Sequence, residues 1–251
     1  MDPAVSFRRV SYRAGGTEVL REMTLDVREG ETLVLLGRSG SGKTTALKMV
    51  NRLLVPSSGE VRVEGRPTTE WDPILLRRRI GYVIQEVGLF PHFTVERNVG
   101  LVPSLEGRPA AEIGRRVADL LREVGLSPAE YASRLPRELS GGERQRVGVA
   151  RALAADPPIL LFDEPFGALD PVTRLELQRQ FLSLRRAHGK TSLFVTHDVR
   201  EALLLASRIA LLCEGRVDLV AAPEEFRRAR GEEAAAFLAC LEADGEREAE
   251  A

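Results

Sequence analysis

The residues that could do chemistry lie in an ordered series along the chain. The first group is the glycine-rich sequence Gly37-Arg38-Ser39-Gly40-Ser41-Gly42-Lys43-Thr44. After it come a lone polar Gln85, the sequence Leu139-Ser140-Gly141-Gly142-Glu143, the carboxylate pair Asp163-Glu164, and Thr196-His197-Asp198. Such residue types can hold phosphate groups, bind Mg²⁺ and activate a water molecule. The series predicts a second anion site without a phosphate of its own, which favours a working unit of two chains.

Residues 37–44, the phosphate loop, fit the pattern G-x-x-x-x-G-K-[ST] between a predicted strand and a predicted helix. Glycines let backbone N–H groups turn around phosphate oxygens, and the positive end of the helix adds attraction. We expect Lys43 to contact the β- and γ-phosphates and the Thr44 hydroxyl to bind Mg²⁺. A chance match on a flexible glycine loop would not explain the strand and helix around it. The chain is rich in arginine, so we interpret Lys43 as a compact point charge that a planar guanidinium cannot replace.

Asp163 and Glu164 follow an apolar run at residues 159–162. Parallel α/β sheets bind their ligands at the carboxyl ends of strands. We expect Asp163 to hold Mg²⁺, directly or through water, and Glu164 to polarise the attacking water. Without the phosphate loop, the same pair would fit the start of a solvated loop.

Residues 139–143, the Ser140 segment, fit a capping box with Ser140 at the N-cap and Glu143 at N3. A capping box does not explain the two glycines, because glycine weakens a helix start. Glycines here would leave backbone N–H groups accessible to an external anion. Asp170 before Pro171 predicts another N-cap.

Composition limits the classes of protein to consider. The chain has 251 residues, 36 basic against 37 acidic side chains, and a net charge of -1, so a nucleic-acid binder is disfavoured. Its two cysteines form neither a disulfide framework nor a metal spacing. No apolar stretch reaches the roughly 18 residues that span a bilayer, and no signal-peptide core is present. We expect any membrane role to come through partner subunits.

The periodicity predicts an α/β fold with a parallel-sheet core, a small N-terminal antiparallel part and an inserted helical subdomain. The expected strands are residues 5–10, 23–27, 31–36, 60–64, 80–84, 159–162, 192–195 and 209–212, and the clearest helices are residues 43–53, 110–124 and 143–154. The predicted main domain is residues 1–220, with its core at about 1–88 and 156–220 and the helical subdomain at about 89–155. A C-terminal helical tail is predicted at 221–251.

From about residue 5 to 220, the series of motifs resembles the nucleotide-binding subunit of ABC transporters. The resemblance implies a P-loop NTPase fold, ATP hydrolysis and Mg²⁺ as cofactor. It implies catalytic roles for Glu164, His197 and Lys43, and Mg²⁺ binding by Thr44, Gln85 and Asp163. The implied ATP contacts are Tyr12, Gly37, Arg38, Ser39, Gly40, Ser41, Gly42, Lys43, Thr44, Thr45, Gln85 and Asp163, with Ser140, Gly141, Gly142, Glu143 and Asp170 acting from the opposite chain. On residue type alone, His197 fits a structural role and Tyr12 an exposed strand tyrosine.

The same resemblance implies a head-to-tail dimer of this chain with two ATP molecules at its interface. It places permease subunits against about residues 85–99, with exposed Phe90 and Phe93 as contacts, on the cytoplasmic face of the cell membrane. A substrate-binding protein takes part indirectly, and no nucleic acid is expected. The family most often has Gln where this chain has Glu143, so we expect a modest change in phosphate affinity.

Among ABC proteins, the free-standing cassette is similar to importer subunits. The glycine betaine, carnitine and choline group is indicated by residues 48–53, 80–85, 88–95 and 146–153. Many members of that group continue into a pair of CBS domains, whereas this sequence stops at Ala251, and the resemblance therefore does not extend to ionic-strength sensing. The alternatives are an importer of another amine or of amino acids, and a non-transport ABC ATPase.

Overall fold

The computed structural model describes residues 3–85, 87–167 and 169–249. The chain divides into two compact units, the first formed by Met1–Trp71 with Thr191–Ala251 and the second by Asp72–Lys190. Within the described ranges, no helix has both the length and the apolar character needed to cross a membrane.

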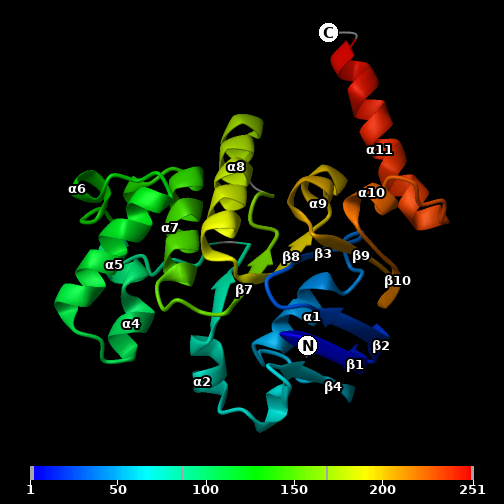
Figure 1. The fold of residues 1–251 in the computed structure, drawn as a ribbon, viewed down its shortest axis with the longest axis horizontal. Helices are drawn as coiled ribbons and strands as arrows, with labels where there is room; N and C mark the ends of the chain where they lie inside the picture. Colours follow the sequence, from blue (N-terminus) through cyan, green and yellow to red (C-terminus); the bar gives the residue numbers. More distant parts are fainter. Residues whose placement is uncertain (1–2, 86, 168, 250–251) are drawn as a thin grey trace. The chain divides into compact units, whose positions relative to one another are not determined.

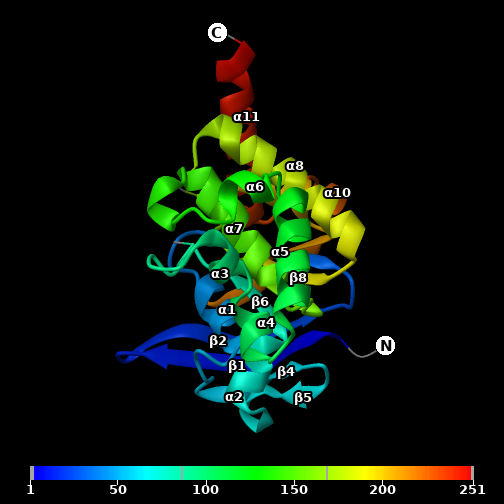
Figure 2. The same ribbon diagram turned by 90° about the vertical axis from the view of Figure 1, so that its left-hand side faces the viewer.

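The first unit contains a small antiparallel sheet, whose strands Figure 2 shows side by side. Its strand order is β2-β1-β4-β5. The members are β1 (Val5–Ala14), β2 (Thr17–Val27), β4 (Ser58–Val63) and β5 (Arg66–Pro67). Gly15 and Gly16 join β1 to β2 with positive φ angles of 55° and 85°, which glycine adopts without steric cost. The predicted N-terminal antiparallel part is therefore present, with strands longer than expected.

The first unit also holds a set of parallel strands. β3 (Thr32–Leu36) pairs in parallel with β8 (Thr191–Thr196) and with β9 (Arg208–Cys213), and β10 (Arg216–Ala221) pairs antiparallel with β9. All five residues of β3 are buried, as its unbroken apolar sequence predicts for a strand covered on both faces. β10 was not among the predicted strands.

The helices of the first unit include α1, which directly follows the phosphate loop. They are α1 (Lys43–Val50), η1 (Thr68–Glu70), α9 (Val199–Leu205), α10 (Pro223–Phe226) and α11 (Glu232–Ala249). The predicted helix at 43–53 ends early because Arg52 has a φ of 53°, which is not helical.

The second unit is mostly helical, and Figure 1 shows α4 to α7 gathered together in green. Its two strands, β6 (Ile80–Val83) and β7 (Ile159–Asp163), pair in parallel. Its helices are α2 (Pro73–Arg78), α3 (Val95–Val99), α4 (Leu101–Leu105), α5 (Ala110–Glu123), α6 (Pro128–Tyr131), η2 (Pro136–Glu138), α7 (Gly141–Leu153) and α8 (Pro171–His188). α5 buries Val117, Leu120 and Leu121 on one face, as the helical spacing predicts.

Helices α3 to α7 fall within residues 89–155, where the sequence predicts a helical subdomain. The division of the chain into a core, that subdomain and a C-terminal tail stays a prediction.

Candidate functional site

Lys43 begins α1, and its side chain folds back into the phosphate loop. Its Nζ donates hydrogen bonds to the carbonyl oxygens of Gly37, at 2.7 Å, and Arg38, at 2.9 Å. Only 4% of the residue is exposed. The positive charge of Lys43 therefore lies inside the loop that is predicted to hold phosphate.

Two glycines of the phosphate loop leave no room for a side chain. A Cβ at Gly37 would lie 2.4 Å from the carbonyl oxygen of Leu212, and a Cβ at Gly42 would lie 2.6 Å from Leu20 Cδ2. Gly42 is the N-cap of α1, with a φ of 101° and no side-chain cap bond. The first N–H groups of α1 therefore face the loop without an acceptor from the N-cap side chain.

The Ser41 hydroxyl is a further donor in this loop. Ser41 is 7% exposed, and its Oγ has no hydrogen-bond partner within the part of the chain that the structure describes. Buried hydroxyl groups normally have a partner. The donor set of the loop thus fits an anion with several oxygen atoms, such as a phosphate group.

Arg38, which is predicted to contact ATP, directs its guanidinium elsewhere. Its Nε lies 2.6 Å from the Glu233 carboxylate of α11, and 69% of its side chain is exposed. The remaining loop residues Ser39 and Gly40 are exposed. Any contribution of Arg38 to phosphate binding is therefore expected from its backbone.

The other predicted residues of the first unit lie on β1, α1 and the end of β8. Tyr12 is half-buried in β1, and Thr44 and Thr45 are half-buried in the first turn of α1. Leu36 and Thr196 are paired in register at the ends of β3 and β8. His197, which is exposed, therefore leaves the same edge of the sheet as the phosphate loop.

The two predicted carboxylates occupy the end of β7 in the second unit. Asp163 is 4% exposed and accepts a hydrogen bond from the Tyr82 hydroxyl at 3.2 Å. Burial, followed by the negative charge of Asp163, raises the pKa of Tyr82 above its ordinary range. Glu164 has a φ of 45°, a left-handed conformation that is uncommon outside glycine and turns the chain sharply. Strain of this kind often accompanies a functional site.

Tyr82 was not predicted as a site residue. Its position in β6 opposite Leu161 of β7 brings its hydroxyl to Asp163. No motif marks such a tyrosine, because the contact depends on how the two strands pair.

A cavity of about 420 Å³ in the second unit brings Gln85 and Gly141 together. It is lined by Gln85, Val87, Gly88, Leu89, Pro136, Gly141, Arg144, Gln145, Pro165 and Leu169. Gln145 is 3% exposed, and its Nε2 has no partner among the residues described. Gln145 was not predicted as a site residue, since a glutamine on a helix carries no signal of its burial.

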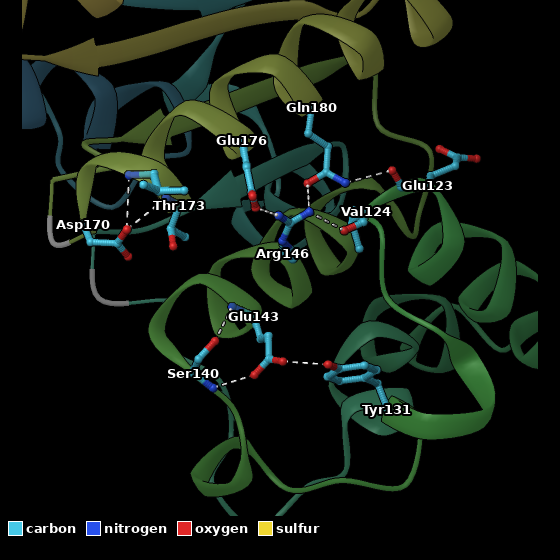
Figure 3. Close-up of polar contacts among 11 residues, drawn as sticks. Glu123, Val124, Tyr131, Ser140, Glu143, Arg146, Asp170, Thr173, Glu176 and Gln180 are labelled. Atoms are coloured by element: carbon cyan, nitrogen blue, oxygen red, sulfur yellow. Dashed lines mark hydrogen bonds and ion pairs between the residues drawn. The ribbon is translucent and has the colours of Figure 1, made fainter.

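The Ser140 segment forms the predicted capping box at the start of α7, which Figure 3 shows. Ser140 Oγ accepts from the Glu143 N–H at 3.2 Å, and Glu143 Oε2 accepts from the Ser140 N–H at 2.7 Å. The other carboxylate oxygen, Oε1, accepts from the Tyr131 hydroxyl at 2.6 Å. The hydrogen bond from Tyr131, followed by those from Ser140, holds the pKa of Glu143 below its ordinary value.

The two glycines of this segment differ in their surroundings. A Cβ at Gly142 would lie 2.4 Å from Thr173 Cγ2 of α8, whereas a Cβ at Gly141 would have Leu169 Cδ2 at 3.8 Å as its nearest neighbour. Gly141 is exposed and Gly142 is buried. Gly142 is therefore required by helix packing, and Gly141 is the glycine that leaves the helix start open.

Asp170 caps α8, as predicted. Its carboxylate accepts from the N–H groups of Val172, at 3.1 Å, and Thr173, at 3.0 Å. Hydrogen bonds from Thr173 are the main cause that lowers the pKa of Asp170. Its neighbour Ala168 lies outside the described residues.

The predicted permease-contact segment, residues 85–99, is only partly exposed. Phe90 is 42% exposed, but Phe93 is half-buried, with the Arg97 guanidinium 3.7 Å from its ring centroid. The expectation that Phe93 is exposed is therefore wrong, because α3 supplies a cation that covers its ring. Buried Asn98 accepts from the Phe90 N–H at 2.8 Å, a structural role that the sequence did not predict. Glu86 is not among the described residues.

The predicted donors for Mg²⁺ are a hydroxyl, an amide and a carboxylate. Oxygen ligands of these types suit Mg²⁺, so the donor set fits the ion. No group of three or more His, Cys, Asp or Glu side chains that could hold a metal occurs in the described ranges. Thr44 belongs to the first unit, and Gln85 and Asp163 belong to the second.

The known proteins that resemble this chain are ATP-binding proteins of transport systems. A family profile described as ABC transporter matches residues 20–167. The glycine betaine/carnitine/choline transport ATP-binding protein OpuCA of Bacillus subtilis is 50% identical over 214 residues, which cover 85% of this chain and 56% of the relative. The osmoprotectant import ATP-binding protein OsmV of Salmonella typhimurium is 51% identical over 204 residues, covering 81% of this chain and 53% of the relative. The chain spans about half the length of these curated relatives.

A solved structure agrees with the sequence comparisons. The dimeric, post-hydrolysis structure of the ATP-binding cassette MJ0796 bound to ADP and Pi has a TM-score of 0.77 and 34% identity, covering 90% of this chain and 99% of that chain. The predicted fold class is confirmed.

Proposed function

This chain belongs to the ABC transporter family, and we propose that it binds and hydrolyses ATP to drive the import of a quaternary amine such as glycine betaine, carnitine or choline. The observation that carries the proposal is the phosphate loop, which holds a buried lysine and a serine hydroxyl that has no partner among the described residues. The substrate class is taken from two relatives that are 50% and 51% identical to this chain, a glycine betaine/carnitine/choline transport protein and an osmoprotectant import protein.

ATP binding falls to the first unit. Lys43 and the loop N–H groups take the phosphates, because a buried cation and the positive end of a helix attract a polyanion. The Ser41 hydroxyl donates to a phosphate oxygen and so gains the partner it lacks among the described residues. Tyr12 stacks on the adenine ring.

Hydrolysis depends on the end of β7 and on His197. Glu164 accepts a proton from the attacking water, while His197 orients that water against the γ-phosphate. Thr44, Gln85 and Asp163 would hold Mg²⁺, which when bound neutralises charge on the phosphates. Tyr82 holds the Asp163 carboxylate in place through its 3.2 Å hydrogen bond.

The Ser140 segment and Asp170 act on ATP held by a second copy of the chain. The dimeric cassette MJ0796 bound to ADP and Pi supports this arrangement. Closure of the dimer on ATP and reopening after hydrolysis would pass motion through residues 85–99 to permease subunits. The chain would then work on the cytoplasmic face of the membrane, with a substrate-binding protein acting through the permease.

Glu164→Gln tests the hydrolytic part of the proposal. The amide keeps the shape of the side chain but cannot accept a proton, so we expect turnover to fall by at least about a hundredfold. ATP binding should remain, and size-exclusion chromatography should detect an ATP-bound dimer. Near wild-type turnover in this variant would refute the role of Glu164 as general base.

The transport part is tested in a bacterium that lacks its own osmoprotectant ATP-binding subunit. Expression of this chain with its permease and binding protein should restore uptake of radiolabelled glycine betaine or choline. Glu164→Gln in the same cells provides the matched negative control. Uptake of an unrelated amino acid in place of both amines would show that the substrate class is wrong.

A further inference from the structure

The Glu143 carboxylate is held from two sides within the second unit (Figure 3). Its Oε2 accepts from the Ser140 N–H at 2.7 Å, at the start of α7. Its Oε1 accepts from the Tyr131 hydroxyl at 2.6 Å, at the end of α6. Because each oxygen is bound to a different element, the carboxylate cannot rotate without losing a hydrogen bond.

This arrangement determines what Ser140 can offer to a ligand. Ser140 Oγ accepts from the Glu143 N–H at 3.2 Å, so its hydroxyl proton remains available to donate outward. Ser140 and Gly141 are both exposed. The capping box therefore leaves the Ser140 hydroxyl as a donor at an exposed helix start, beside the exposed Gly141.

The position of Tyr131 is itself constrained. The Arg134 guanidinium lies 4.4 Å from the centroid of its ring, and the same guanidinium pairs with Glu130 at 2.6 Å. The cation covers the ring face while the hydroxyl points to Glu143. Tyr131 is thus placed to hold the carboxylate on the side of α6.

We propose that Tyr131 is a positioning residue of the second anion site, and that it acts through Glu143. By binding Oε1, it keeps Oε2 on the Ser140 N–H and keeps the negative charge directed toward α6. Ser140 and Gly141 then remain directed at an incoming phosphate despite the carboxylate beside them. The identification of that phosphate as part of ATP on a second copy rests on the proposed function.

Tyr131→Phe tests the inference, because it removes only the hydroxyl. We expect kcat for ATP hydrolysis to fall about tenfold, the lower end of the scale of one hydrogen bond to a charged group. ATP affinity of the monomer should be unchanged, since the phosphate loop is untouched. Amide exchange at Ser140, followed by NMR, should be faster. Asp119→Asn is the control, because it removes an exposed ion pair with Arg122 on α5, and it should alter neither kcat nor the Ser140 exchange rate.

Two Glu143 variants separate positioning from simple stabilisation. Glu143→Gln should retain most activity, because its amide oxygen can accept from Ser140 while its NH₂ donates to the Tyr131 oxygen. Glu143→Ala should lose at least as much as Tyr131→Phe. In the Glu143→Ala background, the Tyr131→Phe change should have no further effect on kcat.

Several results would overturn the inference. They are an unchanged kcat and Ser140 exchange rate in Tyr131→Phe, an undiminished Tyr131→Phe effect in the Glu143→Ala background, or a loss of monomer ATP affinity. If the wild-type chain fails to hydrolyse ATP, the proposed function is wrong. The Ser140 exchange rate in Tyr131→Phe and Glu143→Ala then still decides whether Tyr131 orders this helix start.

Discussion

The starts of α1 and α7 are both open to an anion, but they are built in different ways. α1 follows Gly42, which has a left-handed backbone and no side chain to cap the helix. The Lys43 ammonium donates hydrogen bonds to two carbonyl oxygens of the adjoining loop. α7 follows Ser140, which forms a complete capping box with Glu143. One helix start has a buried positive charge and a hydroxyl without a partner among the described residues. At the other, the N–H groups of Ser140 and Glu143 are each bound by the other residue's side chain.

The difference indicates that the two helix starts bind phosphate under different conditions. A loop with a buried cation and unpaired donors gains stability when a polyanion arrives. A capped helix start with a carboxylate at N3 is already stable, and its negative charge disfavours a phosphate bound there alone. We therefore expect α1 to bind ATP on its own and α7 to act only on ATP that another chain presents.

Lys43→Ala should have the largest effect on ATP binding. Loss of the ammonium should weaken ATP affinity of the monomer by about a hundredfold, the scale of charge-assisted hydrogen bonds. Isothermal titration calorimetry measures the affinity. Lys43→Arg should also weaken ATP binding. A planar guanidinium cannot replace the compact Lys43 ammonium, which lies 2.7 and 2.9 Å from two loop carbonyl oxygens.

The control for this prediction is Lys190→Ala. Lys190 pairs with Asp156 at 2.8 Å in the second unit, so its loss should leave ATP affinity unchanged. Normal ATP binding by Lys43→Arg would show that a point charge is not required.

Ser140→Arg should remove hydrolysis while leaving monomer ATP affinity unchanged. The bulky side chain would occupy the exposed anion face of α7, and removal of such donors costs about a hundredfold or more in turnover. Steady-state ATPase assays and titration calorimetry measure the two effects.

Mixing the Ser140→Arg chain with the Lys43→Ala chain tests whether the two helix starts act in different chains. A head-to-tail heterodimer would combine both defects in one site and leave the other site intact. We expect partial recovery of ATPase activity, provided that one site turns over alone. Loss of ATP binding by monomeric Ser140→Arg would contradict the assignment of the two helix starts to different chains.

Gly142→Ala should destabilise the fold by about 1–3 kcal/mol, the range for overpacking. The added methyl group would lie 2.4 Å from Thr173 Cγ2. Thr173→Ser removes that methyl group and should restore much of the stability in the double variant. Urea unfolding measures the change. Gly141→Ala is the matched control, since its nearest neighbour would be 3.8 Å away, and a comparable loss there would refute the packing explanation.

The smallest expected effect is a pH dependence at the start of α7. The folded-state pKa of Glu143 is lowered from its ordinary value of 4.5, chiefly by the Tyr131 hydrogen bond. Its contribution to stability is therefore present above pH 4.5 and is lost as the pH falls through the lower folded-state pKa. The Tm difference between wild type and Glu143→Gln should shrink between pH 6 and pH 3.5, as measured by thermal unfolding. A constant difference would contradict the ionised, hydrogen-bonded state of Glu143.

Local patterns predicted most of the fold. Continuous apolar runs marked β3, β7 and β8, and helical spacing marked α5, because burial on both faces or on one stripe leaves a direct pattern. β10 was not predicted, although exposed and less exposed residues alternate along it, as they do in a strand with one covered face. The end of α1 was predicted too late because the left-handed Arg52 carries no sequence signal.

By itself, the sequence determined the series of phosphate-handling residues, the family and the elements that carry the series. Short-range patterns suffice for this, because loops, caps and strand ends are encoded by neighbouring residues. Only the tertiary structure decided that Gly142 is required by Thr173, that Tyr131 holds Glu143 and that Tyr82 holds Asp163. These contacts join residues distant in the chain, and they depend on strand pairing and helix packing that no local pattern specifies.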